Sequence, residues 1–175
     1  MKTILATIGI PCVLLVCFSF ISKNALQEKV KITYKLGDIQ NTFEARSIYA
    51  SVKTETVEGK SNSSLTFTLN DYDKKIAFRF VIKDEKVVSD FTGSYPLRFP
   101  GGYQDGESIQ ATNIMIIDTG NATNTFQTRP GGKCEIRLKG TILSVNITGA
   151  KISKGGVDVP FEFSFTSPNT KVKRE

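Results

Sequence analysis

The sequence predicts an all-β protein: a single antiparallel β-sandwich of about eight or nine strands or, as the alternative, a closed lipocalin-like barrel. Three observations lead to this prediction. Apolar and polar residues alternate with a period of two from Val30 onward. Turn-forming pairs such as Gly37-Asp38 and Gly155-Gly156 separate the alternating stretches. Only residues 41–51 admit a helical interpretation, and because both of their faces are mixed, a strand is preferred there as well.

In the first half of the domain, residues 30–36 place apolar side chains on one face and Lys or Thr on the other. The same alternation recurs at 65–69, after the polar run 60–64, and at 76–82. Residues 87–97 are expected to be extended but irregular, because they contain a glycine and a proline.

In the second half, residues 109–118 contain the continuous apolar stretch 114–117, which is typical of a central strand. Stripes at 134–138 and 142–152 follow, and Gly149 in the latter indicates a bulge or bend. The last stripe, 159–165, carries three phenylalanines on one face. These aromatic residues are expected to supply most of a core that has no tryptophan.

The ends of the chain differ from this pattern. Residues 1–22 begin with Met1-Lys2 and continue as an apolar run, as in a secretory signal peptide. Cleavage near Ser19, retention as an N-terminal anchor and lipidation of Cys17 remain alternatives, although Val16 stands where a lipobox has a small residue. Residues 23–29 are then a linker, 30–167 the all-β domain and 168–175 a basic disordered tail.

Composition argues against several chemistries. The chain has no histidine, which removes the commonest general base and metal ligand, and Cys134 is the one cysteine after the signal segment. We therefore predict no cofactor, no metal and no enzymatic activity; Asp105 and Glu107 form the one loop pair worth testing for two-carboxylate hydrolysis. Residues 70–73 have the spacing that begins a calcium loop, but Lys74-Lys75 follows and a turn explains them. A buried role is expected for Cys134.

The net charge of +6 is spread along the chain and not concentrated in one tract, so nucleic acid is not an expected partner. Two long connections, 99–108 and 119–132, are the candidate binding loops. They supply Tyr103, Asp105, Phe126 and Arg129 as candidate contact residues for a protein or a glycan. Contact with a membrane is expected only through the N-terminal segment or a lipid anchor. Asn62, Asn121 and Asn146 begin Asn-x-Ser/Thr sequons.

Three segments carry a resemblance to a known group of proteins. Residues 93–97, 132–148 and 159–166 show the alternation and turn residues of small exported β-sandwich proteins of Gram-negative, Bacteroidetes-type bacteria. The resemblance covers residues 65–167 and rests on structural motifs. It implies a β-sandwich after a signal or lipoprotein peptide, with no assigned activity.

The sequence thus favours an exported, non-enzymatic binding module of the periplasm, cell envelope or extracellular space, acting through its loops or through strand addition at an exposed edge. The alternative is a small barrel that carries an apolar ligand. The carrier hypothesis requires a cavity in the interior among Phe78, Phe80, Phe161 and Phe163.

Overall fold

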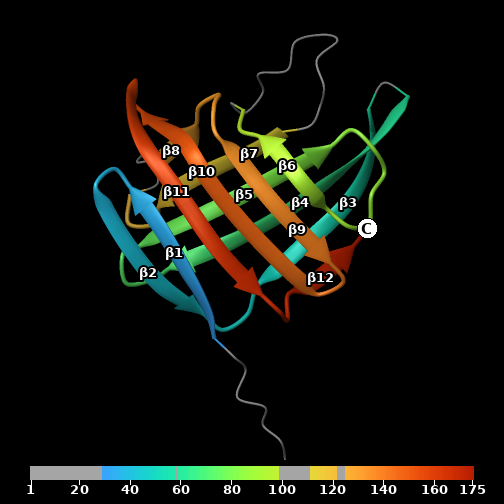
Figure 1. The fold of residues 1–175 in the computed structure, drawn as a ribbon, viewed down its shortest axis with the longest axis horizontal. Coiled ribbons are helices and arrows are strands. Elements are labelled where there is room, and N and C mark those ends of the chain that lie inside the picture. The colour runs from blue at the N-terminus through green and yellow to red at the C-terminus, as the bar shows by residue number, and fades with distance from the viewer. Residues whose placement is uncertain (1–28, 58, 99–110, 122–124) are drawn as a thin grey trace, which may run out of the picture.

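All regular structure in the described part of the chain is β-strand (Figure 1). The computed structural model describes residues 29–57, 59–98, 111–121 and 125–175. The predicted signal segment, most of the linker and the loop 99–108 lie outside these residues. The strands are β1 Val30–Leu36, β2 Ile39–Ala45, β3 Tyr49–Val57, β4 Lys60–Asp71, β5 Ile76–Asp84, β6 Thr92–Pro96, β7 Ala111–Asp118, β8 Thr125–Thr128, β9 Lys133–Lys139, β10 Ile142–Lys154, β11 Val157–Ser167 and β12 Lys171–Arg174.

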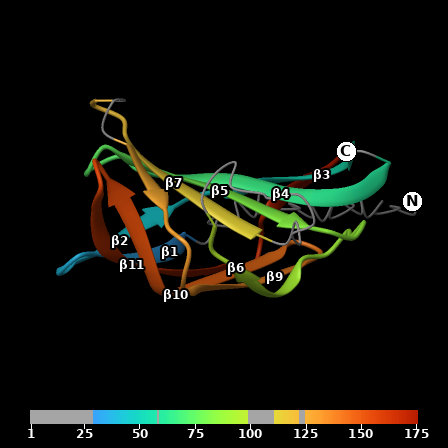
Figure 2. The ribbon, with the colours of Figure 1, turned by 90° about the horizontal axis from the view of Figure 1, so that it is seen from above.

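The strands form one strongly curled, open sheet, a half-barrel. Its order is β12-β3-β4-β5-β7-β8-β10-β11-β1-β2, and β9 and β6 extend it from β10 as a branch. Curling brings the sheet back over itself, so that β3, β4, β5 and β7 face β1, β10 and β11 across the core (Figure 2). The short strand β8 joins the two layers because it pairs with β7 on one side and with β10 on the other. The prediction of an all-β protein is confirmed.

The structure contains more strands than the eight or nine expected, because several are too short or too polar to show in the alternation. The predicted strand over 41–51 is divided between β2 and β3, with a break at 46–48. β4 begins at Lys60, although the sequence pattern places the polar run 60–64 outside the strand, as its boundary. Asn62, Ser63 and Ser64 are buried there, so these polar residues belong to the strand and not to its boundary.

The C-terminal segment differs from the predicted disordered tail. Residues Lys171–Arg174 form β12, which pairs in parallel with β3. The amide of Lys171 donates to the carbonyl of Ile48, and the amide of Glu175 donates to that of Val52. The basic composition that suggested a solvated end is instead a way to blunt an edge strand, whose lysines oppose pairing with another chain.

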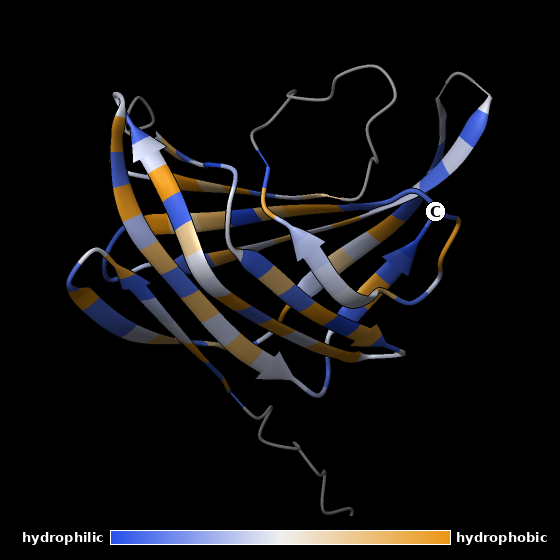
Figure 3. Cartoon of the chain, turned by 45° about the horizontal axis from the view of Figure 1, so that its top comes forward, coloured by the Kyte–Doolittle hydropathy of each residue, from blue (hydrophilic) through white to orange (hydrophobic). Residues whose placement is uncertain are grey.

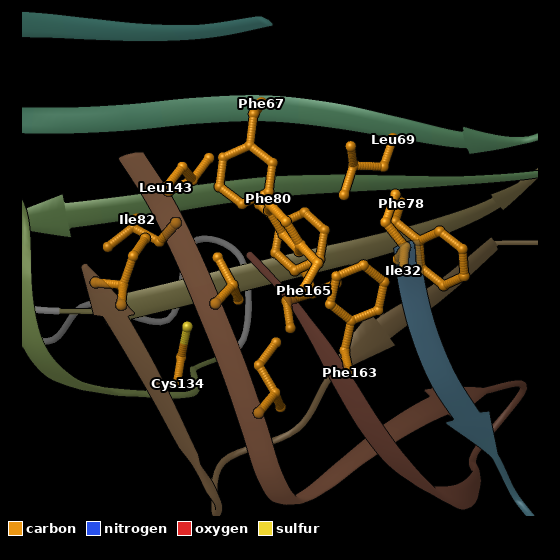
Figure 4. Close-up of a cluster of buried hydrophobic side chains, with 14 of the residues drawn as sticks. Ile32, Phe67, Leu69, Phe78, Phe80, Ile82, Cys134, Leu143, Phe163 and Phe165 are labelled. Carbon is orange, nitrogen blue, oxygen red and sulfur yellow. The ribbon is translucent and has the colours of Figure 1, made fainter. Parts of the chain in front are cut away.

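The core lies between the two layers, and the hydropathy of the strands alternates accordingly (Figure 3). Phenylalanines from β4, β5 and β11 meet at its centre (Figure 4). The ring of Phe163 lies 5.1 Å from that of Phe78 and 4.9 Å from that of Phe80, and Phe161 stacks on Phe78 at 6.3 Å between centroids. These side chains themselves fill the space where the carrier hypothesis places an apolar ligand.

Two further predictions about single residues are confirmed. The register of the β10–β11 pair shifts between Ile147 and Ala150, which places a bulge at Gly149. Cys134 is fully buried on β9, and burial raises the pKa of its thiol to about 12. A thiol with this pKa is neutral and unreactive at physiological pH, so Cys134 acts as a small apolar core residue.

Candidate binding edge

The structure separates the predicted contact residues. Tyr103 and Asp105 lie outside the described residues. Phe126, on β8, packs against the core, and the ammonium group of Lys154 lies 5.5 Å from its ring centroid. Arg129 follows β8; its guanidinium donates to Ser153 Oγ at 3.2 Å and lies 3.4 Å from Asp158 Oδ1. Both residues therefore hold the junction between the layers together, and the described part of the loop 119–132 does not present them as a joint contact surface.

Two buried tyrosine–aspartate pairs link the layers at opposite ends of the β4–β5 hairpin. At one end, Tyr34 Oη donates to Asp71 Oδ2 at 3.2 Å. At the other, Tyr95 Oη donates to Asp84 Oδ2 at 2.6 Å. Each carboxylate accepts a second hydrogen bond, from a main-chain amide a few residues later in the chain. The amide of Lys74 donates to Asp71, and the amide of Lys86 donates to Asp84. Turn chemistry therefore accounts for Asp71.

Both phenols have a pKa above the ordinary value for tyrosine. Burial, and secondarily the neighbouring Asp71 carboxylate, raises the pKa of Tyr34 from 10.0 to about 12. Burial and the hydrogen bond to Asp84 raise the pKa of Tyr95 as well. A phenol whose pKa is raised by folding stabilises the fold fully below its unfolded pKa, and this contribution is lost as the pH rises through the folded pKa.

We expect Tyr34→Phe to lower the free energy of unfolding by about 1–3 kcal/mol at neutral pH, because the buried Asp71 carboxylate loses a donor. Between pH 10.0 and about 12, wild type should lose stability more steeply than Tyr34→Phe, since the variant has no phenol to ionise there. Urea unfolding at a series of pH values measures both effects. Tyr72→Phe, at a side chain that is 84% exposed, should keep the wild-type dependence.

The described strands leave three edges of the sheet: β12, β6 and β2. β12 has four residues, of which three are basic, and β6 has five, including Gly93 and Pro96. Short length, lysines and proline are the devices that protect edges from further pairing. β2 has seven residues, no glycine or proline, and one charged side chain, Glu44. It is the least protected of the three edges.

The hairpin that joins β1 to β2 fixes the direction of the backbone groups along this edge. Leu36 faces Ile39 across the two-residue turn Gly37-Asp38, in which Gly37 has a φ of +62°. The closing pair of such a turn is hydrogen-bonded, and bonded and non-bonded pairs then alternate. The amide of Gly37 donates to the carbonyl of Pro160 on the opposite side of β1, as this alternation requires.

From this alternation, the amides and carbonyls of Gln40, Thr42 and Glu44 point away from β1, toward the outer edge of β2. Within the described residues no strand pairs with that edge. Phe43, between them, is buried and packs edge-on against Tyr34 and stacks on Phe78. The core thus holds β2 in place at the end of the sheet, next to β1 (Figure 1).

A groove of about 770 Å³ runs beside the second half of β2. Its far side is the end of β4 and the start of the β4–β5 turn, where the side chain of Tyr72 is 84% exposed. Its near side is formed by side chains at the open end of the β1–β2 hairpin, remote from the turn Gly37-Asp38. The lining residues are Lys29, Lys31, Thr42, Phe43, Glu44, Arg46, Asn70, Asp71, Tyr72 and Asp73.

Sequence reasoning named an exposed edge in general terms but not β2, because residues 41–51 showed no clear alternation. The signal in the sequence was the turn Gly37-Asp38 directly after an alternating stretch, which indicates a hairpin and hence a second strand. Of the sequon asparagines, Asn62 is buried on β4, whereas Asn121 and Asn146 are exposed.

Comparisons of the chain with protein-family models, with curated proteins and with solved structures find no match. The resemblance to exported β-sandwich proteins therefore stays a prediction. Among the described residues, no group of three or more acidic, cysteine or histidine side chains is placed to hold a metal ion. No helix in that part of the chain is long and apolar enough to cross a membrane.

Proposed function

We propose that this protein is an exported, non-enzymatic binding module, sandwich-like in architecture, that captures an extended segment of another polypeptide at the edge of β2. The observation that carries the proposal is an edge of seven residues with one charge, anchored by Phe43 and bordered by a groove. Such an edge supplies main-chain hydrogen bonds to an added strand, and the groove gives it room. Export rests on the pattern of residues 1–22, and places the module at the envelope or outside the cell.

The lack of histidine in the whole chain, together with the structural engagement of Asp71 and Asp84, supports a binding role over catalysis. Both of these carboxylates are nearly inaccessible and accept hydrogen bonds from tyrosines. A carboxylate held in this way ties two layers together and has no access to a substrate. A polypeptide partner is favoured over a glycan because the edge presents backbone donors and acceptors in strand register.

We expect Thr42→Pro to abolish peptide capture, because proline removes the amide that points to the outer edge and its ring obstructs a neighbouring strand. Thr42→Val is the matched control: it also removes the hydroxyl contact with Thr33, but it keeps the amide. The probe is a phage-displayed library of random peptides, selected on the immobilised protein, followed by affinity measurements on the enriched peptides.

Enriched peptides should bind wild type and Thr42→Val within about twofold of each other, and Thr42→Pro at least about tenfold more weakly. Both variants should melt cooperatively, since an edge position tolerates proline. The proposal is wrong if no peptide is enriched over a blank surface, or if enriched peptides bind folded Thr42→Pro as tightly as wild type.

A further inference from the structure

The groove beside β2 has an uneven distribution of charge on its hairpin side. This side carries three cations, Lys29, Lys31 and Arg46, and one carboxylate, that of Glu44. This carboxylate forms an ion pair with Lys29, in which Lys29 Nζ lies 2.7 Å from Glu44 Oε2. Both side chains are about half exposed. Lys31 and Arg46 have no ion pair with any described residue. We call Lys29, Lys31, Glu44 and Arg46 the basic corner.

The register of the hairpin explains why the basic corner is not balanced internally. The last register pair is Val30 and Ala45, so Lys29 and Arg46, the next residue of each chain segment, are two cations at the same end of the hairpin. Lys31 faces Glu44, but Glu44 is already bound to Lys29. Like charges that face each other across a hairpin repel. An additional anion at this corner would relieve that repulsion.

Two carboxylates lie across the groove, those of Asp71 and Asp73, and neither forms an ion pair with the basic corner. Asp71 is 3% exposed, and its carboxylate accepts hydrogen bonds from Tyr34 and from the amide of Lys74. Asp73 is exposed, and Lys74 and Lys75 follow it directly in the chain. The whole lining thus carries three cations and three carboxylates, but the cations gather at the basic corner, and an occupant meets a local excess of positive charge there.

We propose that the groove selects acidic segments: the strand that adds to β2 carries Asp or Glu at a position that seats its carboxylate between Lys31 and Arg46. This inference rests on the proposed function, because strand addition is what brings the segment to the corner. Rim charges of this kind favour one partner over another and accelerate association more than they tighten binding. The expected preference is moderate and falls with added salt.

The test repeats the library selection on the double variant Lys31→Glu/Arg46→Glu and on a control, Lys133→Glu/Lys139→Glu. The control makes the same change in net charge at two exposed positions of β9, away from the groove. Peptides enriched on wild type and on the control should be rich in Asp and Glu, and should bind the groove variant about tenfold more weakly at low salt. On the groove variant, the enriched peptides should be rich in Lys and Arg.

The possible results separate this inference from the proposed function. Capture that depends on Thr42 but shows no preference for acidic peptides overturns the acidic selection and leaves strand capture standing. Capture that does not depend on Thr42 overturns both. A third result concerns a sulfated glycan such as heparin. If heparin binds wild type, competes there with the peptides and fails to bind the groove variant, the basic corner is an anion site for glycans and the inference is wrong. A dimer that depends on Thr42 and excludes peptides identifies a second copy of the chain as the occupant, and also overturns it.

Discussion

Phe163→Ala is expected to lower the free energy of unfolding by about 3–5 kcal/mol, the range for removing a large aromatic side chain from a packed core. Phe163 is 1% exposed, and its ring contacts those of Phe78, Phe80, Phe161 and Phe165. It joins β5 of one layer to β11 of the other (Figure 4). Its removal leaves a cavity at the centre of the aromatic cluster that both layers build.

Guanidinium-induced unfolding, followed by circular dichroism, measures this effect. Phe163→Leu is the control, because it keeps most of the apolar volume and should cost much less than the alanine variant. A loss below about 1 kcal/mol for Phe163→Ala would contradict the description of this interior as tightly filled. Such a small loss would instead favour the ligand-carrier hypothesis, which requires a cavity in the interior.

Gly132→Ala should be comparably harmful for a different reason. Gly132 has a φ of +81°, and an added Cβ would lie 2.7 Å from the carbonyl oxygen of Gly149 and 2.8 Å from the backbone of Ala150. These atoms belong to the bulge in β10, so they cannot yield without disturbing the β10–β11 register. The left-handed conformation costs about 1–2 kcal/mol and the overlap about 1–3 kcal/mol more.

Gly140→Ala separates the two contributions. Gly140 has a φ of +61°, but no heavy atom lies within 4 Å of its added Cβ. It should therefore lose only the conformational part, about 1–2 kcal/mol. Equal stability losses for the two variants in the same denaturation experiment would show that the contact between Gly132 and the bulge is not tight.

The sequence predicted the fold class because the alternation of residues is a direct consequence of a sheet with one buried face. The stripes at 30–36, 76–82 and 159–165 became β1, β5 and β11, with their phenylalanines in the core. It did not predict β12, because a short basic strand has the composition of a solvated tail. It did not predict the curl of the sheet, because β8 joins the layers through only a few register pairs.

The candidate site was harder to predict than the fold. An aromatic residue and a cation in a long loop, here Phe126 and Arg129, are typical of a binding surface, yet Arg129 pairs with Asp158 and Phe126 packs on the core. Nothing local in a sequence tells which cation finds a partner across the sheet. The basic corner has the same origin. The hairpin register places Lys31 opposite Glu44, but the Glu44 carboxylate forms its ion pair with Lys29, and Lys31 keeps its charge without this partner.

Amide hydrogen exchange on the protein with and without an enriched peptide tests strand capture at β2 most directly. In the free protein, the amides of Gln40, Thr42 and Glu44 should exchange rapidly, because they point to the outer edge and have no strand partner among the described residues. The account predicts that the peptide protects these three amides, and that the amides of Lys171 and Lys173 on β12 stay unchanged. Protection that appears elsewhere, while Gln40, Thr42 and Glu44 keep exchanging as in the free protein, would contradict it.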